Sequence, residues 1–411
     1  MRLAVATLFP LLLAGADLDQ LRKLDETKRL FDLRRALTET AASEPETAYY
    51  RARVHARFGQ EQIAITEFRE FLNTGPAEMM HRKVHQEMAD AYTRLGQYRD
   101  AAAEWTALLG LIPPDDPERA EIEEGLSMWE SLGDVAAQSV EFGGNVLVQA
   151  RYDLLTRSIP LLVNGTKADW ILDTGANLSI VSESEAKRLG LDVRNSSVHG
   201  SSGHTGKQFS TRPAVASEIR VGSARLHNVI VMVIPDHAMH FGPLGLKHLA
   251  GILGLPAIRA LGSVEISANG EMRIEPGPPK TTGKPNICFN ELSPIVQVYH
   301  AGRPVSMALD TGGNVSYLYP SFRDFLTPEE LKELGRRRDR SNGVGGSITL
   351  ESDLVRAIQF ELPGKTVLLK NISLRRASTP AFDGYTEGLL GMDAMNGGFT
   401  LDFRAMQLRL D

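Results

Sequence analysis

Hydrophobic and polar residues follow two different periods along this chain of 411 residues. Residues 18–140 are rich in Ala, Leu, Glu, Arg and Gln, and their apolar positions recur at helical spacing. From Val140 onward, short apolar runs with β-branched residues, such as 159–163 and 229–234, are typical of buried strands. The pattern therefore predicts a helical domain followed by a β-rich domain.

The helical domain contains an internal repeat. Phe-Gly or Leu-Gly pairs that end at Gly59, Gly96 and Gly133 recur every 37 residues. We expect each glycine to end the first helix of a helical pair. The best copy, residues 91–98, resembles a tetratricopeptide repeat, whose usual period is about 34 residues. Such arrays often bind peptides or proteins in a concave groove, so a protein partner is one interpretation, and a packed array without a ligand is the other.

Local signals predict several smaller elements. Asn164-Gly165 between apolar runs is a type I′ hairpin signal. Ser182 with Glu185 three residues later predicts the start of a short helix. A second helix is expected to start near Pro328 and to be closed by the basic run 336–338, where cations suit the C-terminal dipole. The proline-rich stretch 276–285 is expected to be a linker.

The β-rich region is duplicated. Asp173-Thr174-Gly175 and Asp310-Thr311-Gly312 lie 137 residues apart, and each follows an apolar run. Each triplet is followed by an apolar-apolar-Gly segment, and the interval from Asp to that glycine, Gly254 or Gly391, is 81 residues in both copies. Two copies with matched landmarks indicate an internal duplication. Each half therefore offers one carboxylate.

Two carboxylates that share one proton can supply both a base for water and an acid for a carbonyl oxygen. Two like charges in contact do not ionise together easily, so such a pair titrates as a unit. Asp173 and Asp310 are the candidate catalytic residues on this reasoning. We expect Gly175 and Gly312 to permit the tight turns that aim the carboxylates.

These motifs resemble those of aspartic peptidases. Over residues 145–411 each half is similar to a retropepsin subunit, and the tandem arrangement is similar to the pepsin plan. The resemblance implies a bilobal all-β domain with a cleft between its lobes, a polypeptide substrate, and hydrogen bonds from Thr174 and Thr311 across the axis between the lobes. The chain departs from the pepsin type at Ala176 and Gly313, where a hydroxyl residue is usual, and it has no evident flap tyrosine.

Further residues are expected to support this site. Asn177 and Asn314, at matching positions of the two copies, are expected to hold the loops by side-chain bonds to the backbone. Glycine-rich stretches in both halves are candidate flap tips over the cleft, and their glycines are Gly203, Gly206, Gly343, Gly345 and Gly346. The alternative for these stretches is a pair of plain hairpins.

The predicted organisation has four parts: a signal peptide at 1–16, a tetratricopeptide-like domain at 17–140, a first retropepsin-like lobe at 141–280 and a second at 281–411. Arg2, an apolar run and small residues near Ala16 are typical of a secretory signal, and the run is too short to span a bilayer. We therefore expect an exported protein, periplasmic or secreted, without a stable membrane anchor. Its single cysteine, Cys288, forms no internal disulfide and is expected to be a buried structural residue.

Composition and motif searches narrow the function further. A net charge of −6 does not favour a nucleic-acid partner. His81 and His85 could face one another on a helix, but no third ligand follows at a diagnostic spacing, so we predict no metal. Phosphate-cradling and serine-hydrolase motifs are absent from the sequence, and no cofactor is predicted.

The sequence thus predicts an aspartic endopeptidase that cleaves polypeptides with one aspartate from each lobe. A non-catalytic scaffold, in which the helical array and a silent lobe pair bind peptides, is the alternative. The sequence leaves open whether the array recruits substrates or blocks the cleft, and whether the lobes pair within one chain or between two chains.

Overall fold

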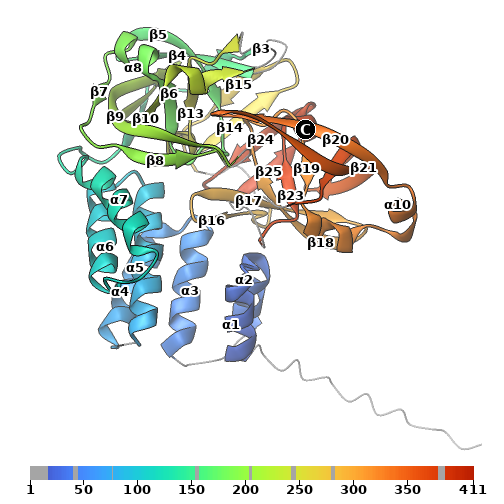
Figure 1. Ribbon diagram of the computed structural model, residues 1–411, viewed down its shortest axis with the longest axis horizontal. Helices are drawn as coiled ribbons and strands as arrows, with labels where there is room; N and C mark the ends of the chain where they lie inside the picture. Colours follow the sequence, from blue (N-terminus) through green and yellow to red (C-terminus); the bar gives the residue numbers. More distant parts are fainter. Residues whose placement is uncertain are drawn as a thin grey trace, which may run out of the picture.

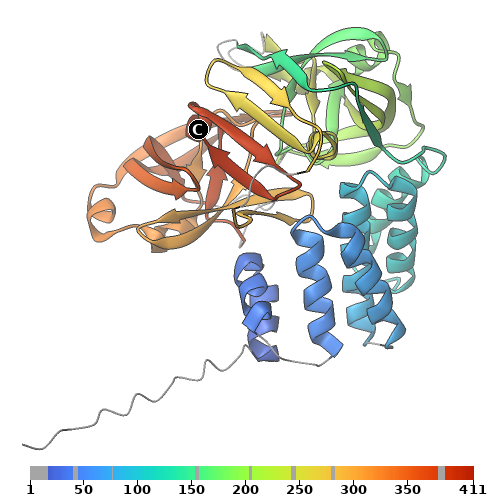
Figure 2. The same cartoon turned by 180° about the vertical axis from the view of Figure 1, so that it is seen from behind.

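The computed structural model describes residues 17–39, 45–75, 77–152, 157–202, 206–241, 247–278, 283–377 and 385–411. A helical array lies beside two β-lobes, as Figure 1 and the reverse view in Figure 2 show. A helical region followed by a bilobal β-rich region confirms the predicted fold class. The predicted signal peptide at 1–16, Gly203 and part of the linker, 279–282, lie outside the described residues.

The array is built from antiparallel helices joined by short turns. Among the described residues its helices are α1 (Leu18–Glu26), α2 (Leu30–Glu39), α3 (Pro45–Arg57), α4 (Glu61–Asn73), α5 (Glu78–Arg94), α6 (Tyr98–Gly110) and α7 (Arg119–Glu130). Gly59 and Gly96 follow α3 and α5 with φ of 79° and 70°, so these glycines end the first helix of a pair as expected. No helix in the described part of the chain is both long and apolar enough to cross a bilayer.

Lobe 1 is a strongly curved sheet in which β9 pairs with both β4 and β10. Its strands are β1 (Ser139–Phe142), β3 (Arg151–Tyr152), β4 (Arg157–Val163), β5 (Thr166–Leu172), β6 (Ser179–Ser182), β7 (Asp192–Val193), β8 (Val198–Ser201), β9 (Gln208–Val221), β10 (Ala224–Ile234) and β13 (Gly251–Leu253). The helices α8 (Glu183–Arg188) and α9 (Leu255–Leu261), the 3-10 helix η1 (Asp236–Met239) and the small pair β11 (His240–Phe241) and β12 (Lys247–His248) complete the lobe.

Lobe 2 repeats this plan, and its β17 pairs with β21 as well as with β16 and β18. Its strands are β16 (Ile287–Asn290), β17 (Ser293–His300), β18 (Arg303–Leu309), β19 (Tyr317–Leu318), β20 (Gly335–Gly343), β21 (Gly346–Leu362), β22 (Lys365–Arg375) and β23 (Gly388–Leu390). The short helices are η3 (Pro320–Phe325), α10 (Pro328–Lys332) and η5 (Met392–Met395).

One sheet joins the two lobes. Its order is β2-β15-β14-β24-β25, and its strands are β2 (Val146–Gln149), β14 (Ser263–Ser267), β15 (Glu271–Ile274), β24 (Gly398–Asp402) and β25 (Gln407–Leu410). Within this sheet the lobes meet at the antiparallel pair β14–β24, in which Ser263 lies opposite Asp402. The lobes therefore share backbone hydrogen bonds within one chain.

Most of the local predictions are confirmed. Asn164 and Gly165 both have positive φ, 47° and 80°, in the two-residue turn between β4 and β5. Ala301 and Gly302 repeat this turn between β17 and β18 with φ of 48° and 73°. The Ser182 side chain caps α8 by accepting from the Glu185 N–H. These turns fix the register of the strands that lead to the duplicated triplets.

The prediction for the basic run 336–338 is wrong. The helix α10 begins with the capping box of Thr327 and Glu330 but ends at Lys332. Gly335 then starts β20, and the three arginines lie in this strand. Cross-strand pairing explains the outcome, because Arg338 Nε lies 2.8 Å from a Glu351 carboxylate oxygen on β21.

The array docks on both lobes through a buried joint. Arg94, at the end of α5, has no exposed side-chain surface. Its guanidinium donates to Glu61 of the array at 3.1 Å and to the Glu291 carbonyl of lobe 2 at 2.6 Å. Arg259 of lobe 1 donates to the Arg94 carbonyl at 3.0 Å, and both guanidiniums lie over the Phe289 ring. The three parts of the molecule thus meet at one buried charge cluster.

Apolar packing extends this joint. Cys288 of β16 is buried in the core of the array, and burial raises the pKa of its thiol, which suits a structural residue. Further along the array, Tyr98 stacks on Trp129 with ring centroids 5.6 Å apart. That pair packs against Val198 and Val215 of lobe 1. The array is therefore part of the same packed body as the lobes.

Candidate active site

The two duplicated triplets are delivered by equivalent strands. Asp173 follows β5, and its N–H donates to the Leu253 carbonyl of β13 at 3.0 Å. Asp310 follows β18, and its N–H donates to the Leu390 carbonyl of β23 at 3.1 Å. β13 and β23 each run parallel to the strand that delivers the aspartate. The apolar-apolar-Gly segment of each repeat therefore forms a strand that supports the loop carrying the aspartate.

Reciprocal hydrogen bonds lock the two loops together. The Thr174 N–H donates to Thr311 Oγ1 at 3.0 Å, and the Thr311 N–H donates to Thr174 Oγ1 at 3.1 Å. The Thr174 hydroxyl donates to the Leu309 carbonyl and the Thr311 hydroxyl to the Leu172 carbonyl, both at 2.8 Å. Both threonines are buried. All four bonds join one lobe to the other, so the loops pair within a single chain.

The glycines of the triplets are required for space. We expected Gly175 and Gly312 to permit a tight turn. Neither residue has a positive φ, so backbone conformation is not the main reason for glycine at these positions. A Cβ at Gly312 would lie 2.3 Å from Asp173 Cγ, and a Cβ at Gly175 would lie 2.9 Å from Asp310 Cγ. Each glycine therefore faces the carboxylate of the opposite lobe. Any side chain would push the two carboxylates apart.

The two carboxyl groups are close enough to share a proton. Burial, the negative charge of Asp310 and a hydrogen bond between the two carboxyl groups raise the pKa of Asp173 well above its ordinary value. Backbone donors support both carboxyl groups. Asp310 Oδ1 accepts the N–H groups of Gly312 and Gly313, both at 2.8 Å. Asp173 Oδ1 accepts the Gly175 N–H at 2.8 Å, and the backbone of Ala176 also favours its ionised form. The two groups therefore have similar backbone support and titrate as one pair.

Two serines tie the supporting strands to the loops. Ser179 Oγ accepts the Gly254 N–H at 3.1 Å, and Ser316 Oγ accepts the Gly391 N–H at 2.9 Å. In lobe 2 the Ser316 hydroxyl donates in turn to Asp393 Oδ1 at 2.5 Å. The two serines occupy matching positions of the two repeats, 137 residues apart. Asp393 carried no sequence signal, because it lies 77 residues from its partner.

The asparagines of the repeat behave less uniformly. Asn177 is exposed, and its side chain makes no hydrogen bond to any residue that the structure describes. Asn314 is also exposed. The expected bonds from side chain to backbone are therefore not found at Asn177. The backbone bonds around the aspartates hold that loop instead.

Two hairpins extend from the lobes at the candidate flap positions. The first joins β8 to β9, and its turn contains Gly206, with φ of 66°. The second joins β20 to β21 between Gly343 and Gly346, and Gly345 and Gly346 have positive φ. The second hairpin reaches lobe 1, where the Gly345 N–H donates to the Ala238 carbonyl at 2.9 Å.

The first hairpin is also bonded to the helical array. His199 of β8 contacts Glu124 of α7 through both its backbone N–H and its Nδ1, with Nδ1 2.8 Å from Glu124 Oε1. Ser196 and Ser127 are joined by a hydrogen bond of 3.2 Å in the same region. The array therefore contacts one of the two hairpins near the candidate site. No motif or spacing in the sequence indicated this contact.

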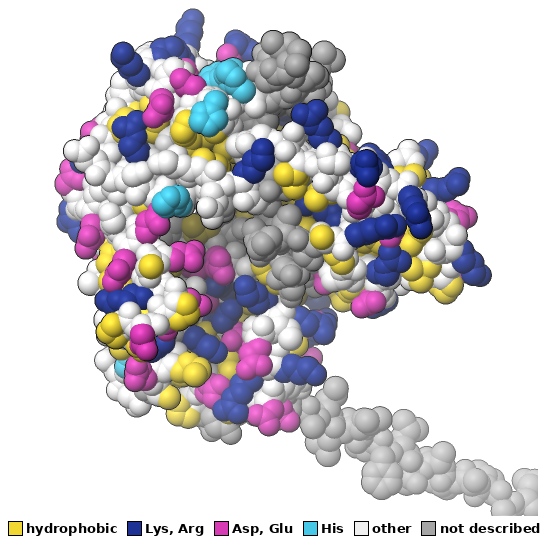
Figure 3. Space-filling model, in the orientation of Figure 1, with side chains coloured by type: hydrophobic (Ala, Val, Ile, Leu, Met, Phe, Trp, Pro, Cys, Tyr) yellow, Lys and Arg dark blue, Asp and Glu magenta, His cyan; other side chains and the backbone are white. Residues whose placement is uncertain are grey.

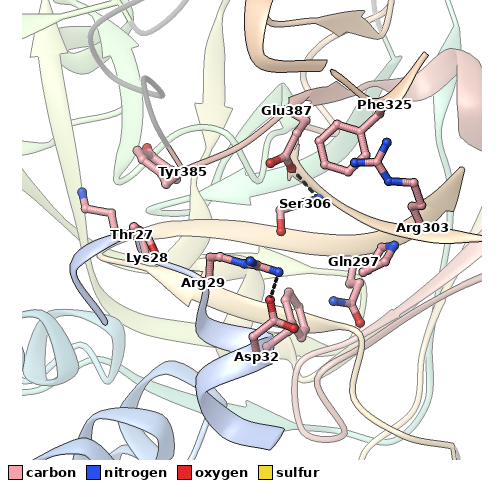
Figure 4. A pocket seen from close by; sticks show the side chains of 12 residues that line it. Thr27, Lys28, Arg29, Asp32, Gln297, Arg303, Ser306, Phe325, Tyr385 and Glu387 are labelled. Carbon is pink, nitrogen blue, oxygen red and sulfur yellow. Dashed lines mark hydrogen bonds and ion pairs between the residues drawn. The ribbon is translucent and has the colours of Figure 1, made fainter. Parts of the chain in front are cut away.

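A separate cavity lies between the array and the outer side of lobe 2. Its volume is about 400 Å³. Figure 4 shows Arg29 of the α1–α2 turn and, from lobe 2, Ser306, Arg303 and Glu387 around this cavity. Lys28 Nζ lies 4.7 Å from the centre of the Tyr385 ring. The Glu387 carboxylate accepts the Ser306 N–H at 2.7 Å, and burial raises its pKa. Asp173 and Asp310, the catalytic dyad, do not line this cavity.

The described residues contain no group of three His, Cys, Asp or Glu side chains that could hold a metal ion. His240 and His248 meet edge to face across β11 and β12, with ring centroids 5.1 Å apart. His85 pairs with Glu104 at 2.7 Å.

Comparisons with known proteins give one family match and two structural similarities. Residues 159–256 match the family model described as Aspartyl protease. Among solved structures, the chain is similar to an aspartic proteinase from Irpex lacteus, with 13% identity, a TM-score of 0.42 and coverage of 64% of this chain and 96% of that one. It is also similar to a retropepsin-like aspartic protease from Rickettsia conorii, with 19% identity, a TM-score of 0.22 and coverage of 34% and 94%. No curated protein matches.

Proposed function

From a first lobe that matches the aspartyl protease family, we propose that this protein is an exported aspartic endopeptidase. One observation carries the proposal. Asp173 and Asp310 face one another across the lobes and are held by the reciprocal threonine bonds. This arrangement supports a pair that shares one proton, which acid–base hydrolysis requires.

In the proposed mechanism, a water bound between the two carboxyl groups attacks the peptide carbonyl. The ionised carboxylate takes a proton from the water, and the protonated carboxyl group donates its proton to the carbonyl oxygen. Asp173 and Asp310 titrate as one pair, so the single proton is shared between them before attack. As the carbon–nitrogen bond breaks, the pair donates its proton to the leaving amine and takes one from a hydroxyl of the tetrahedral diol, so it again holds one proton.

The test compares four proteins on an unstructured polypeptide, with products identified by mass spectrometry. We expect wild type to cleave, and Asp173→Asn and Asp310→Asn each to lose cleavage, because one carboxyl group cannot serve as both acid and base. Asp169→Asn is the matched control, since this carboxylate lies on the same strand, β5, but is paired with Arg151 at the surface. Wild-type turnover in either dyad variant would refute the shared-dyad mechanism.

Two further outcomes separate the alternatives. A metal chelator is expected to leave cleavage intact, and a loss restored by zinc would indicate a metallopeptidase instead. If wild type and all variants bind the polypeptide but none cleaves it, the non-catalytic scaffold is the better interpretation. Export is proposed from the signal-like pattern at residues 1–16, and N-terminal sequencing of the protein recovered from the medium or periplasm tests it.

A further inference from the structure

The two sides of the dyad are equivalent in backbone but differ in chemistry. In lobe 1, β6 pairs in parallel with β10 so that Ile180 lies opposite Met232. In lobe 2, β19 pairs in parallel with β22 so that Tyr317 lies opposite Ser373. Tyr317 therefore takes the place of Ile180, and two residues further along the outer strands Arg375 takes the place of Ile234. We call the side chains at these positions the lobe 1 flank and the lobe 2 flank.

The lobe 1 flank is apolar. Ile180 and Ile234 pack with Ala176, which directly follows the first triplet, and with Ile252 of β13. Val344, at the tip of the β20–β21 hairpin, packs into the same cluster. An apolar side chain from lobe 2 thus already lies against this flank, which shows the kind of group that it accepts.

The lobe 2 flank carries a buried cation. Arg375 is 5% exposed, and its guanidinium carbon lies 3.5 Å from the centre of the Tyr317 ring. Tyr317 packs on Leu389, and a Cβ at Gly313 would lie 3.5 Å from Leu389 Cδ2. Burial, the neighbouring Tyr319 and the charge of Asp310 all raise the pKa of the Tyr317 hydroxyl. The cation and its ring therefore lie beside the second catalytic loop.

Arg375 lacks a counter-charge within the described part of the chain. Its Nη2 donates to the Ser341 hydroxyl at 3.2 Å, and its Nη1 has no hydrogen-bond partner among the described residues. The next residue, Arg376, is exposed and paired with the Asp353 carboxylate. A buried guanidinium without an anion is unfavourable, because it has given up water without gaining a charge partner. An anion supplied from outside the chain would remove this cost.

We propose that Arg375 selects an acidic side chain of the substrate, Asp or Glu, on the lobe 2 side of the cleaved bond, while the lobe 1 flank takes an apolar side chain on the other side. The proposal rests on the proposed peptidase function and names its substrate class. A carboxylate suits this site because it can accept the free Nη1–H and neutralise the guanidinium at the same time.

The approach to this flank is also cationic. Arg336, Arg338 and Arg340 are exposed along β20, the strand that carries Ser341. Arg340 bonds the neutral Ser347 hydroxyl and has no carboxylate partner in the described residues. Figure 3 shows Lys and Arg side chains gathered over the part of lobe 2 that holds β20 and β21. Such a surface attracts acidic segments although the whole chain is net negative.

The test uses peptides blocked at both ends that differ only at the residue expected to meet Arg375, Glu in one and the isosteric Gln in the other. We expect wild type to cleave the Glu peptide with a kcat/KM about tenfold or more above that of the Gln peptide, as for one buried charge-assisted hydrogen bond. Arg375→Met keeps the apolar stem and removes the charge, so the ratio should fall to about one. Arg376→Met is the matched control and should retain the wild-type ratio.

The outcomes separate this inference from the function on which it rests. Equal cleavage of both peptides by wild type would overturn the inference and leave the peptidase function intact. An undiminished preference in Arg375→Met would overturn the role of Arg375. If that variant does not fold, the wild-type comparison of Glu with Gln still decides. Cleavage of no peptide and no polypeptide by wild type would overturn both the inference and the function.

Discussion

The reciprocal threonine bonds should stabilise the two catalytic loops, and this stabilisation can be measured without a substrate. In Thr311→Val the shape is nearly unchanged, but the hydroxyl that donates to the Leu172 carbonyl and accepts the Thr174 N–H is lost. Both backbone groups lose this partner in a region that water does not reach, since Thr174 is 0% exposed. Each orphaned group costs about 1–3 kcal/mol, so we expect a loss of about 2–6 kcal/mol.

Two control variants isolate the hydroxyl. Thr311→Ser keeps the hydroxyl and should lose less than about 1.5 kcal/mol, as expected for one methyl group. Thr93→Val removes an equally buried hydroxyl that donates to the Ala89 carbonyl inside α5, and that carbonyl keeps its helical bond. We therefore expect little change in Thr93→Val.

The measurement must be local, because the chain has several packed parts and need not unfold in one step. Native-state hydrogen exchange read by mass spectrometry reports the opening free energy of peptides from β5 and β18, which lead into the two loops. The reasoning is refuted if Thr311→Val lowers protection in both strands no more than Thr93→Val does.

Other predictions concern the dyad. Gly312→Ala should lower kcat/KM at least 100-fold, because the added Cβ would displace the Asp173 carboxylate. Gly125→Ala is the control and should keep its activity, since a Cβ there meets open space. Similar activity of the two variants would contradict the steric argument. Because the folded-state pKa of Asp173 is raised, wild type loses stability as pH rises from the unfolded value of about 3.9 through the folded-state pKa. Asp173→Asn lacks this loss, so its Tm relative to wild type should increase as pH rises above about 4, and a pH-independent difference in Tm would disprove this. We expect wild type to have a pH optimum of roughly pH 5–7. The hydroxyls added in Ala176→Ser/Gly313→Ser should move the alkaline limb of the kcat/KM profile to lower pH, because they can stabilise the ionised carboxylates. An unchanged limb would show that positions 176 and 313 do not tune the pKa values of Asp173 and Asp310.

The sequence predicted those features in which spacing alone carries the geometry. Equal intervals from each Asp to its Leu-Gly landmark predicted a duplication with one equivalent loop in each half. In the structure, β13 and β23 pair with the strands that lead to these two loops. The Asn164-Gly165 turn was predictable because only a few residues tolerate two successive positive φ angles.

Other features depend on partners that are distant in sequence. The basic run 336–338 was assigned to a helix end from its neighbours, whereas its cross-strand partner Glu351 decided the outcome. Arg375 gave no signal, because its meaning arises from Tyr317, which lies on another strand. The reason for glycine at 312 likewise depends on Asp173 of the opposite lobe.

The buried joint at Arg94 restricts how the cleft can open. The Arg94 guanidinium donates to lobe 2, and the Arg94 carbonyl accepts a hydrogen bond from Arg259 of lobe 1. Rotating one lobe away from the other would therefore leave buried charged groups without their partners. The hairpin tip is held more lightly, by the Gly345 hydrogen bond to Ala238 and by the packing of Val344. We therefore expect a substrate chain to enter by lifting this hairpin while the two lobes stay fixed, so that the helical array acts as a brace that confines motion to a single moving part.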